Sequence, residues 1–407
     1  MQSLKEFYKI GPGPSSSHTI GPQRAAKRFD EAYPCAAKIV VTLHGSLSLT
    51  GKGHLTDKII LETIKDKEVE ILWDDDELPG HPNGMIFRAF DGVDEMIGQW
   101  IVYSVGGGTI VIDGLSEDGE VPELYDLNSL DEIYAYIQDN DMDLYDYVVS
   151  VEGEGITPFL EDIFDNFIDS TKRGLKAEGY LPGALNLEKV AKKIYEQALQ
   201  EEDETKRNKL LLMSYAYATS EENGSGGFIV TAPTCGAAGV MPAFVYHYYK
   251  DLGYSKEDIV KAIGVAGLFG NLVKHNAAIS GAECGCQSEV GTAVSMAAAA
   301  AAYIEGLNLR EIEYAAELAM EHHLGLTCDP VRGYVQVPCI SRNAQGILRA
   351  IDAKDTSEII ADTNANKISF DTVIRTMKET GDDLKVEYRE TALGGLAKNY
   401  YRDNKLE

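Results

Sequence analysis

The chain has 407 residues, with 37 Lys and Arg against 65 Asp and Glu, which gives a formal net charge of −28 at pH 7. This acidic excess argues against a nucleic-acid-binding protein, because affinity for a phosphate backbone comes largely from Lys and Arg. Hydrophobic residues make up 44% and charged residues 25%, the ordinary mixture of a globular protein with a packed core. From this length we expect about two domains.

Neither a secretory signal nor a membrane span is expected. The chain opens with MQSLKEFYKI, which lacks an apolar signal core, and no stretch reaches the ~18 apolar residues that a span needs. We therefore expect a cytoplasmic protein that binds neither nucleic acid nor membrane. Its six cysteines are too few for a disulfide scaffold and are expected to be reduced.

The first part of the chain alternates strand-like and helix-like segments. An amphipathic helix is expected to begin near Gln23, and the spacing over residues 55–66 predicts another. β-branched and apolar residues predict strands over residues 37–47, 68–73, 85–90, 99–105 and 109–114. We expect the acidic stretch from Glu117 to Asp146 to be loop and linker.

Helical patterns dominate after Pro158. The predicted helices are Leu187–Gln200, Glu201–Ala218, Gly236–Tyr249, Lys256–Leu272, Glu289–Gly306, Leu309–His323, Ile368–Thr380 and Val386–Lys398. Six consecutive alanines, Ala297 to Ala302, predict close helix packing in the middle of a bundle. The sequence thus predicts a two-domain α+β fold, with an N-terminal α/β domain over residues 1–150 and an all-α helical domain over residues 151–407.

A polar turn precedes the first expected helix. Two Gly-Pro pairs lead into hydroxyl and imidazole groups, which are Ser15, Ser16, Ser17, His18 and Thr19. Such groups before a helix N-terminus suit a carboxylate or a phosphate. An ordinary N-cap and loop explain the same residues equally well.

A second polar segment, from His44 to Asp57, follows the first strand. It has some likeness to a phosphate loop, but the spacing is one residue too long and Gly53 stands where Ser or Thr would bind magnesium, so we reject a nucleotide site. His54 then lies on a strand-to-helix turn, where α/β sheets carry ligand-binding groups. His81 and Asn83 lie on a further turn, and histidine suits acid–base work near neutral pH.

Five of the six cysteines fall in the helical half, and these are Cys235, Cys284, Cys286, Cys328 and Cys339. The remaining one, Cys35, is expected to be a small buried hydrophobic residue. Thiolates bind zinc and iron–sulfur clusters, and the wide spacing after C-x-C differs from the paired ligands of structural zinc, which favours a cluster. Free cysteines buried in an Ala-rich bundle are the alternative.

Six motifs occur in order between Ile10 and about Leu396: GPSSSHT-x-GP, HGSL with TGKGH-x-TD, TAPT-x-GAAG, SGAECGCQSEVG, AMEHHLGLTCDPV and VQVPCI-x-RNA. Together they resemble the iron–sulfur L-serine dehydratases, also called L-serine ammonia-lyases, in the form that fuses a β and an α subunit. The resemblance implies that the α/β half corresponds to β and the helical half to α. It also implies a lyase that converts L-serine to pyruvate and ammonia, and a homodimer.

The resemblance implies an oxygen-sensitive 4Fe-4S cluster with three cysteine ligands, Cys286, Cys328 and Cys339, and one open iron. Cys284 and Cys235 are expected to be spare. The open iron would act as a Lewis acid on the serine hydroxyl. Some fused relatives end in a cysteine thought to cap this iron, and because no cysteine follows Cys339 we do not expect such capping here.

A base must remove the α-proton of serine, and the candidates are His54, which we prefer slightly, and His81. The predicted substrate-binding residues are Ser15, Ser16, Ser17, His18, Thr19 and Asn83. Because the histidines lie in one half and the cysteines in the other, the site is expected between the halves.

Three alternatives to this interpretation are considered. Pyridoxal phosphate chemistry needs a Schiff-base lysine, and no lysine stands in a matching setting. Another β-hydroxy amino acid, such as L-threonine, is possible as substrate because one methyl group is worth only about 1–3 kcal/mol of discrimination. A serine-sensing module with structural zinc is the non-enzymatic reading, and metal analysis separates it from the cluster.

Overall fold

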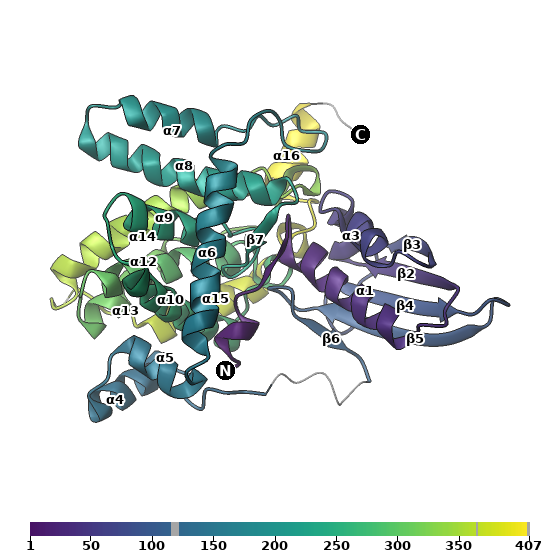
Figure 1. Cartoon of the computed structure of the whole chain (residues 1–407), viewed down its shortest axis with the longest axis horizontal. Coiled ribbons are helices and arrows are strands. Elements are labelled where there is room, and N and C mark those ends of the chain that lie inside the picture. The colour runs from purple at the N-terminus through teal and green to yellow at the C-terminus, as the bar shows by residue number, and fades with distance from the viewer. Residues whose placement is uncertain (115–121, 364, 405–407) are drawn as a thin grey trace.

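A helical half and a smaller sheet half lie side by side in the computed structural model, which describes residues 1–114, 122–363 and 365–404 (Figure 1). The strands are β1 (Ile10–Pro12), β2 (Lys38–His44), β3 (Glu68–Asp74), β4 (Gly84–Phe90), β5 (Met96–Ser104), β6 (Ile110–Ile112) and β7 (Phe228–Val230). The five predicted strands of the first half correspond to β2 through β6 and are confirmed.

The sheet of the first half has the order β3-β2-β4-β5-β6. Strands β2 and β3 are parallel, and the other neighbours are antiparallel. Helix α1 (Gly21–Ala32) lies across one face of the sheet (Figure 1). Its Phe29 packs among Val41, Phe87 and other apolar residues, which form the hydrophobic core of the sheet half. This helix begins close to the predicted position at Gln23. Two short helices, α2 (Ser46–Gly51) and α3 (Thr56–Thr63), follow β2.

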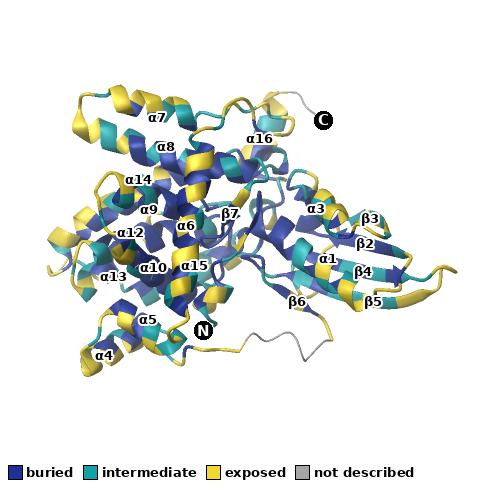
Figure 2. Cartoon of the chain, viewed as in Figure 1, coloured by how far each residue is buried: buried dark blue, intermediate teal, exposed yellow. Residues whose placement is uncertain are grey.

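The second half is built from helices around α12 (Thr292–Ile304). Its six alanines are fully buried, because their small side chains let α9, α10, α13 and α14 pack closely against it (Figure 2). The other helices of this half are α4 (Leu130–Asn140), α5 (Leu144–Glu152), α6 (Ile156–Gly174), α7 (Ala191–Gln200), α8 (Glu204–Gly224), α9 (Val240–Lys250), α10 (Lys256–Asn276), α11 (Gly281–Cys284), α13 (Leu309–Glu321), α14 (Cys339–Ile360), α15 (Phe370–Asp383) and α16 (Gly395–Asp403).

The two-domain α+β fold class is confirmed, and seven of the eight helices predicted after Pro158 have counterparts at similar positions. Helices α6 and α14 were not among those predicted. None of the helices in the described residues is both long and apolar enough to cross a membrane.

The acidic stretch predicted as linker contains α4 and most of α5, so that prediction is wrong for residues 130–146. Each helix starts with a capping box, in which Ser129 pairs with Glu132 and Asp143 pairs with Asp146. These side chains bind backbone N–H groups that a helix start leaves free, so acidic residues stabilise the helix here. Residues 117–121 of the stretch lie outside the described residues.

The last predicted helix, Val386–Lys398, is wrong over its first half. Residues Val386–Tyr388 form a single 3-10 turn, and the helix begins only at Gly395. Between them, Glu390 and Ala392 have φ angles of +59° and +57°, in the left-handed region that ends regular helices. The loop turns inward there, because Glu390 and Thr391 are buried.

Strand β1 pairs antiparallel with β7 and so joins the start of the chain to the helical half. Phe7 and Tyr8 belong to the helical core, and the Tyr8 hydroxyl donates to the Ile263 carbonyl at 2.9 Å. Buried side chains from Tyr125 to Val148 belong to the same core. By packing, the change from one core to the other falls before Tyr125. The domain boundary at residue 150 stays a prediction.

Candidate active site

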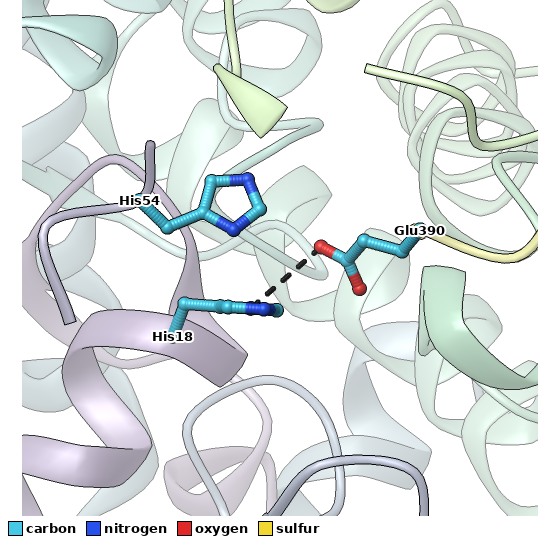
Figure 3. A group of neighbouring side chains, drawn as sticks. All are labelled: His18, His54 and Glu390. Atoms are coloured by element: carbon cyan, nitrogen blue, oxygen red, sulfur yellow. Dashed lines mark ion pairs between the residues drawn. The ribbon is translucent and has the colours of Figure 1, made fainter. Parts of the chain in front are cut away.

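Two imidazole rings and one carboxylate meet in the buried region between the halves (Figure 3). The His18 and His54 ring centroids are 4.2 Å apart, with an interplanar angle of 67°. The Glu390 Oε1 atom is 3.8 Å from His18 Nδ1. One ligand atom from each of the three residues lies within 4.8 Å of the others, so the group has the spacing to hold a metal ion or to move protons.

Thr50 of α2 connects the two rings. Its Oγ1 atom is 2.9 Å from His18 Nε2 and 3.1 Å from His54 Nδ1, and it donates to the Ser46 carbonyl at 2.9 Å. His54 Nε2 is buried and has no hydrogen-bond partner in the described part of the chain. A buried polar atom without a partner marks a position where a ligand group fits.

Burial makes both rings hard to protonate. It lowers the pKa of His18 to about 4, and it lowers the pKa of His54 well below the usual range, with a further contribution from the neighbouring His18. Both rings are therefore neutral at pH 7. A neutral imidazole carries a lone pair and can accept a proton.

We expect His18 to make the folded protein less stable as the pH falls from about 6.5 toward 4. In this window the unfolded chain protonates the imidazole and the folded protein does not, which lowers the free energy of unfolding by about 1.4 kcal/mol per pH unit. The free energy of unfolding, measured by urea titration, should thus fall more steeply between pH 7 and pH 5 for the wild type than for His18→Gln. Equal slopes would contradict the burial of a neutral ring.

The predicted hydroxyl turn is a π-helical turn, Ser16–Ile20, that leads directly into α1. All five predicted side chains are buried. Ser15 Oγ is 3.1 Å from His18 Nδ1, which holds the ring from the side opposite Thr50. Thr19 Oγ1 is within 2.8 Å of the Pro12 and Ser15 carbonyls, so its single proton is already used within the turn.

His81 and Asn83 connect the sheet half to the helical half. His81 Nε2 is 3.0 Å from Glu283 Oε1, and His81 Nδ1 accepts the Asn83 backbone N–H at 3.0 Å. Both ring nitrogens of His81 are therefore occupied. Asn83 Nδ2 donates to the Ser104 carbonyl at 3.3 Å, while its Oδ1 atom is buried without a partner among the described residues.

Cys286, Cys328 and Cys339 lie near one another. Burial raises the pKa of the Cys328 and Cys339 thiols well above the usual range. The carboxylates of Glu390 and Glu289 raise the pKa of Cys328 further, and the sulfur of Cys286 raises that of Cys339. Arg342 follows Cys339 by three residues on α14, and its positive charge counteracts the burial that raises the pKa of the Cys286 thiol to about 11. It also donates to the Thr327 carbonyl at 2.6 Å, which holds it beside Cys328.

The other three cysteines have different surroundings. Cys284 faces α15, where a side chain at Gly381 would come within 2.6 Å of its sulfur. Cys235 is buried next to Ser16 and Glu289. Cys35, which we expected to be buried, is exposed, because it lies in the turn between α1 and β2 at the outer end of the sheet half.

Sequence reasoning missed two carboxylates, Glu390, which is buried, and Glu289, which is half-buried. Thr234 donates to Glu289 Oε1 at 2.7 Å, Cys328 Sγ is 3.9 Å from Glu289 Oε2, and burial raises the pKa of Glu289 to about 7. Burial likewise raises the pKa of Glu390, with a further contribution from Glu289. Glu289 belongs to a quoted motif, but Glu390 lies in a loop with no periodic pattern, so only the fold reveals it.

Glu390 is fixed by both halves of the molecule. Its backbone N–H donates to the Cys328 carbonyl at 2.8 Å, and its own carbonyl accepts the Ser46 hydroxyl at 3.0 Å. A non-glycine residue in the left-handed region costs roughly 1–3 kcal/mol, which such contacts must offset. Glu390 thereby connects the imidazole pair to the segment that carries Cys328.

Comparison with known proteins agrees with this division of the chain. A family model described as "Serine dehydratase beta chain" matches residues 3–72 and 62–115, and one described as "Serine dehydratase alpha chain" matches residues 114–397. An L-serine dehydratase of Streptomyces coelicolor is 38% identical over 98% of each chain. L-serine dehydratase TdcG of Escherichia coli is 38% identical over 98% of this chain and 99% of its own. An L-serine dehydratase of Helicobacter pylori is 36% identical over 97% and 98%.

Proposed function

The chain belongs to the serine dehydratase family, whose β and α chains it joins in one polypeptide, and from this premise we propose that it converts L-serine to pyruvate and ammonia. The observation that carries the proposal is the position of Glu390, whose carboxylate lies 3.8 Å from His18 and whose backbone N–H donates to the backbone carbonyl of Cys328. Acid–base groups beside thiols that can bind a metal suit the elimination of a hydroxyl group.

We propose that Cys286, Cys328 and Cys339 hold a 4Fe-4S cluster with one open iron. Three thiols from separate segments fit this group, with Cys286 and Cys328 buried and Cys339 half-buried. A side chain at Gly281 would come within 3.1 Å of Cys328 Sγ, so glycine leaves room there. Arg342 supplies a positive charge beside the thiols. When bound, the cluster supplies a Lewis acid for the substrate hydroxyl.

His54 is the proposed base. Because the Thr50 hydroxyl donates to the Ser46 carbonyl, its oxygen accepts a hydrogen bond from His54 Nδ1–H. The unprotonated nitrogen of His54 is then Nε2. This atom has no partner among the described residues and is free to take the α-proton of serine. His81 has both nitrogens occupied, so its proposed role is to position Asn83 and Glu283.

The remaining groups orient the substrate in this proposal. Asn83 Oδ1, a buried acceptor without a partner in the described chain, suits the serine ammonium group. The turn formed by Ser15, Ser16 and Ser17, together with His18, suits the carboxylate, whereas Thr19 stabilises the turn itself. Loss of the α-proton and the hydroxyl group gives aminoacrylate, which tautomerises to an imine, and water hydrolyses the imine to pyruvate and ammonia.

The proposal includes a homodimer in the cytoplasm, as the family resemblance implies. Sedimentation of the anaerobic protein tests the dimer directly, with a mass of one 44.5 kDa chain as the result that would contradict it.

Anaerobic purification with iron, sulfide and zinc analysis, followed by a pyruvate assay on L-serine, tests the proposal. We expect about four irons per chain and activity that is lost in air, as an exposed cluster iron requires. Full activity in metal-free protein would overturn the cluster. Zinc without sulfide would support a metal-binding module instead. An intact cluster with no turnover of L-serine would overturn the assignment of L-serine as the substrate.

A further inference from the structure

A cavity of about 740 Å³ opens between the two halves, beside the buried imidazole group. Its walls come from α1, α3, the turn before α1 and the segment between α8 and β7. The volume lies within the range of small-molecule sites, roughly 300–1,000 Å³. Of the predicted site residues, only Thr19 reaches this cavity, so it is separate from the proposed serine site.

The cavity is positively charged in a chain whose net charge is −28. Arg24, Lys27, Lys58 and Lys65 line it, against one carboxylate, Glu62. Lys58 and Glu62 are 3.7 Å apart, and both are more than half exposed. For Lys27 and Lys65, the described ranges place no carboxylate within ion-pair distance. Arg24 is half-buried and donates to the Gly108 carbonyl at 3.1 Å, which fixes its guanidinium at the wall.

The other part of the wall is apolar. Leu55, Ile59 and Phe228 line it, and Phe228 is 60% exposed although it is a large aromatic residue. Aromatic side chains left in water next to cations form a surface on which an organic group can pack while its charge is paired. A ligand that fits both the cationic part and the apolar part of the wall has an anionic group and an apolar or planar group.

We propose that this cavity binds a small phosphorylated organic molecule. A phosphate carries close to two negative charges and three acceptor oxygens, which match the guanidinium and the unpaired ammonium groups. Serine does not fit, since its ammonium group is repelled by the same cations. A long polyanion does not fit either, because the surrounding chain is strongly acidic. The occupant contacts Thr19 and Leu55, the residues that directly follow His18 and His54.

Isothermal titration of the full-length anaerobic protein with phenyl phosphate, a probe with both features, tests the proposal. We expect saturable binding with a Kd below about 10 mM at 0.15 M salt, and no binding of phenol under the same conditions. The double variant Lys27→Glu/Lys65→Glu should weaken binding at least about tenfold, and Phe228→Ala should weaken it several-fold. Circular dichroism confirms that each variant is folded.

The matched control is Lys193→Glu/Lys398→Glu, which makes the same change in net charge at exposed lysines on α7 and α16. It should bind phenyl phosphate as tightly as the wild type. The proposal is overturned if the wild type shows no saturable binding of phenyl phosphate. It is also overturned if the Lys27→Glu/Lys65→Glu variant binds as tightly as the wild type, or if the control variant loses as much affinity as that variant. Because the readout is binding rather than pyruvate formation, this result is independent of the proposed function.

Discussion

Replacement of Cys286, Cys328 or Cys339 by Ala should lower pyruvate formation at least about 1000-fold and remove most of the iron and sulfide. Each thiol comes from a different segment, namely the start of the turn after α11, the loop after α13 and the first residue of α14. We expect neither Cys284, which faces α15, nor Cys235, which lies beside Glu289, to substitute for a ligand. Iron and sulfide analysis beside the pyruvate assay measures both effects in one preparation.

The matched controls are Cys284→Ala and Cys235→Ala, because these thiols are also buried in the helical core region and lose the same atoms. Both variants should keep about four irons per chain and activity within a few-fold of the wild type. If Cys284→Ala removed the cluster while one of the three proposed ligands proved dispensable, the ligand set would be wrong. Loss of folding in every variant would instead appear in the far-UV circular dichroism spectrum.

Replacement of His54 by Asn should lower kcat by about 10²–10⁴-fold, the usual contribution of a general base. The Asn amide can still donate to Thr50 Oγ1 as His54 Nδ1 does, so the change removes chiefly the free Nε2 atom. Iron content should stay at the wild-type value, since the described structure shows no hydrogen bond from His54 to a cysteine. Steady-state kinetics on L-serine with iron analysis separates the two effects.

His81→Asn is the comparison variant for the choice of base. It should act mainly on KM, because His81 holds Asn83 and reaches Glu283, while its own nitrogens are occupied. A larger fall in kcat for His81→Asn than for His54→Asn would reverse the assignment. A double variant with full turnover would remove both histidines from the proton transfer.

Local pattern was enough to predict the parts of the fold in which neighbouring residues determine structure. The alanine run of α12 and the apolar, β-branched segments of β2 to β5 can each be recognised from the residues of that element alone. Helices α4 and α5 were also predictable, because S-x-x-E and D-x-x-D at Ser129 and Asp143 are visible capping signals. The acidic composition of this stretch is typical of a linker, and only the two caps distinguish it from one.

Long-range contacts determine the rest of the site. Thr50 precedes His54 by four residues, a helical spacing that signals contact, yet its bond to His18 joins residues 32 positions apart. Glu390 reaches Ser46 across 344 residues from a loop with left-handed backbone. No periodic pattern in either segment predicts such a contact, since it depends on how the two halves pack.

The pairing of β1 with β7 affects the order in which the protein folds during translation. The Tyr8 hydroxyl binds a carbonyl 255 residues later, and a ribosome needs roughly 10–50 s to make that length at about 5–20 residues per second. All five strands of the larger sheet leave the ribosome long before β7 exists. The sheet half can therefore fold first. The segment that carries Phe7, Tyr8 and β1 stays unpaired, in contact with solvent or with a chaperone, until β7 has been made.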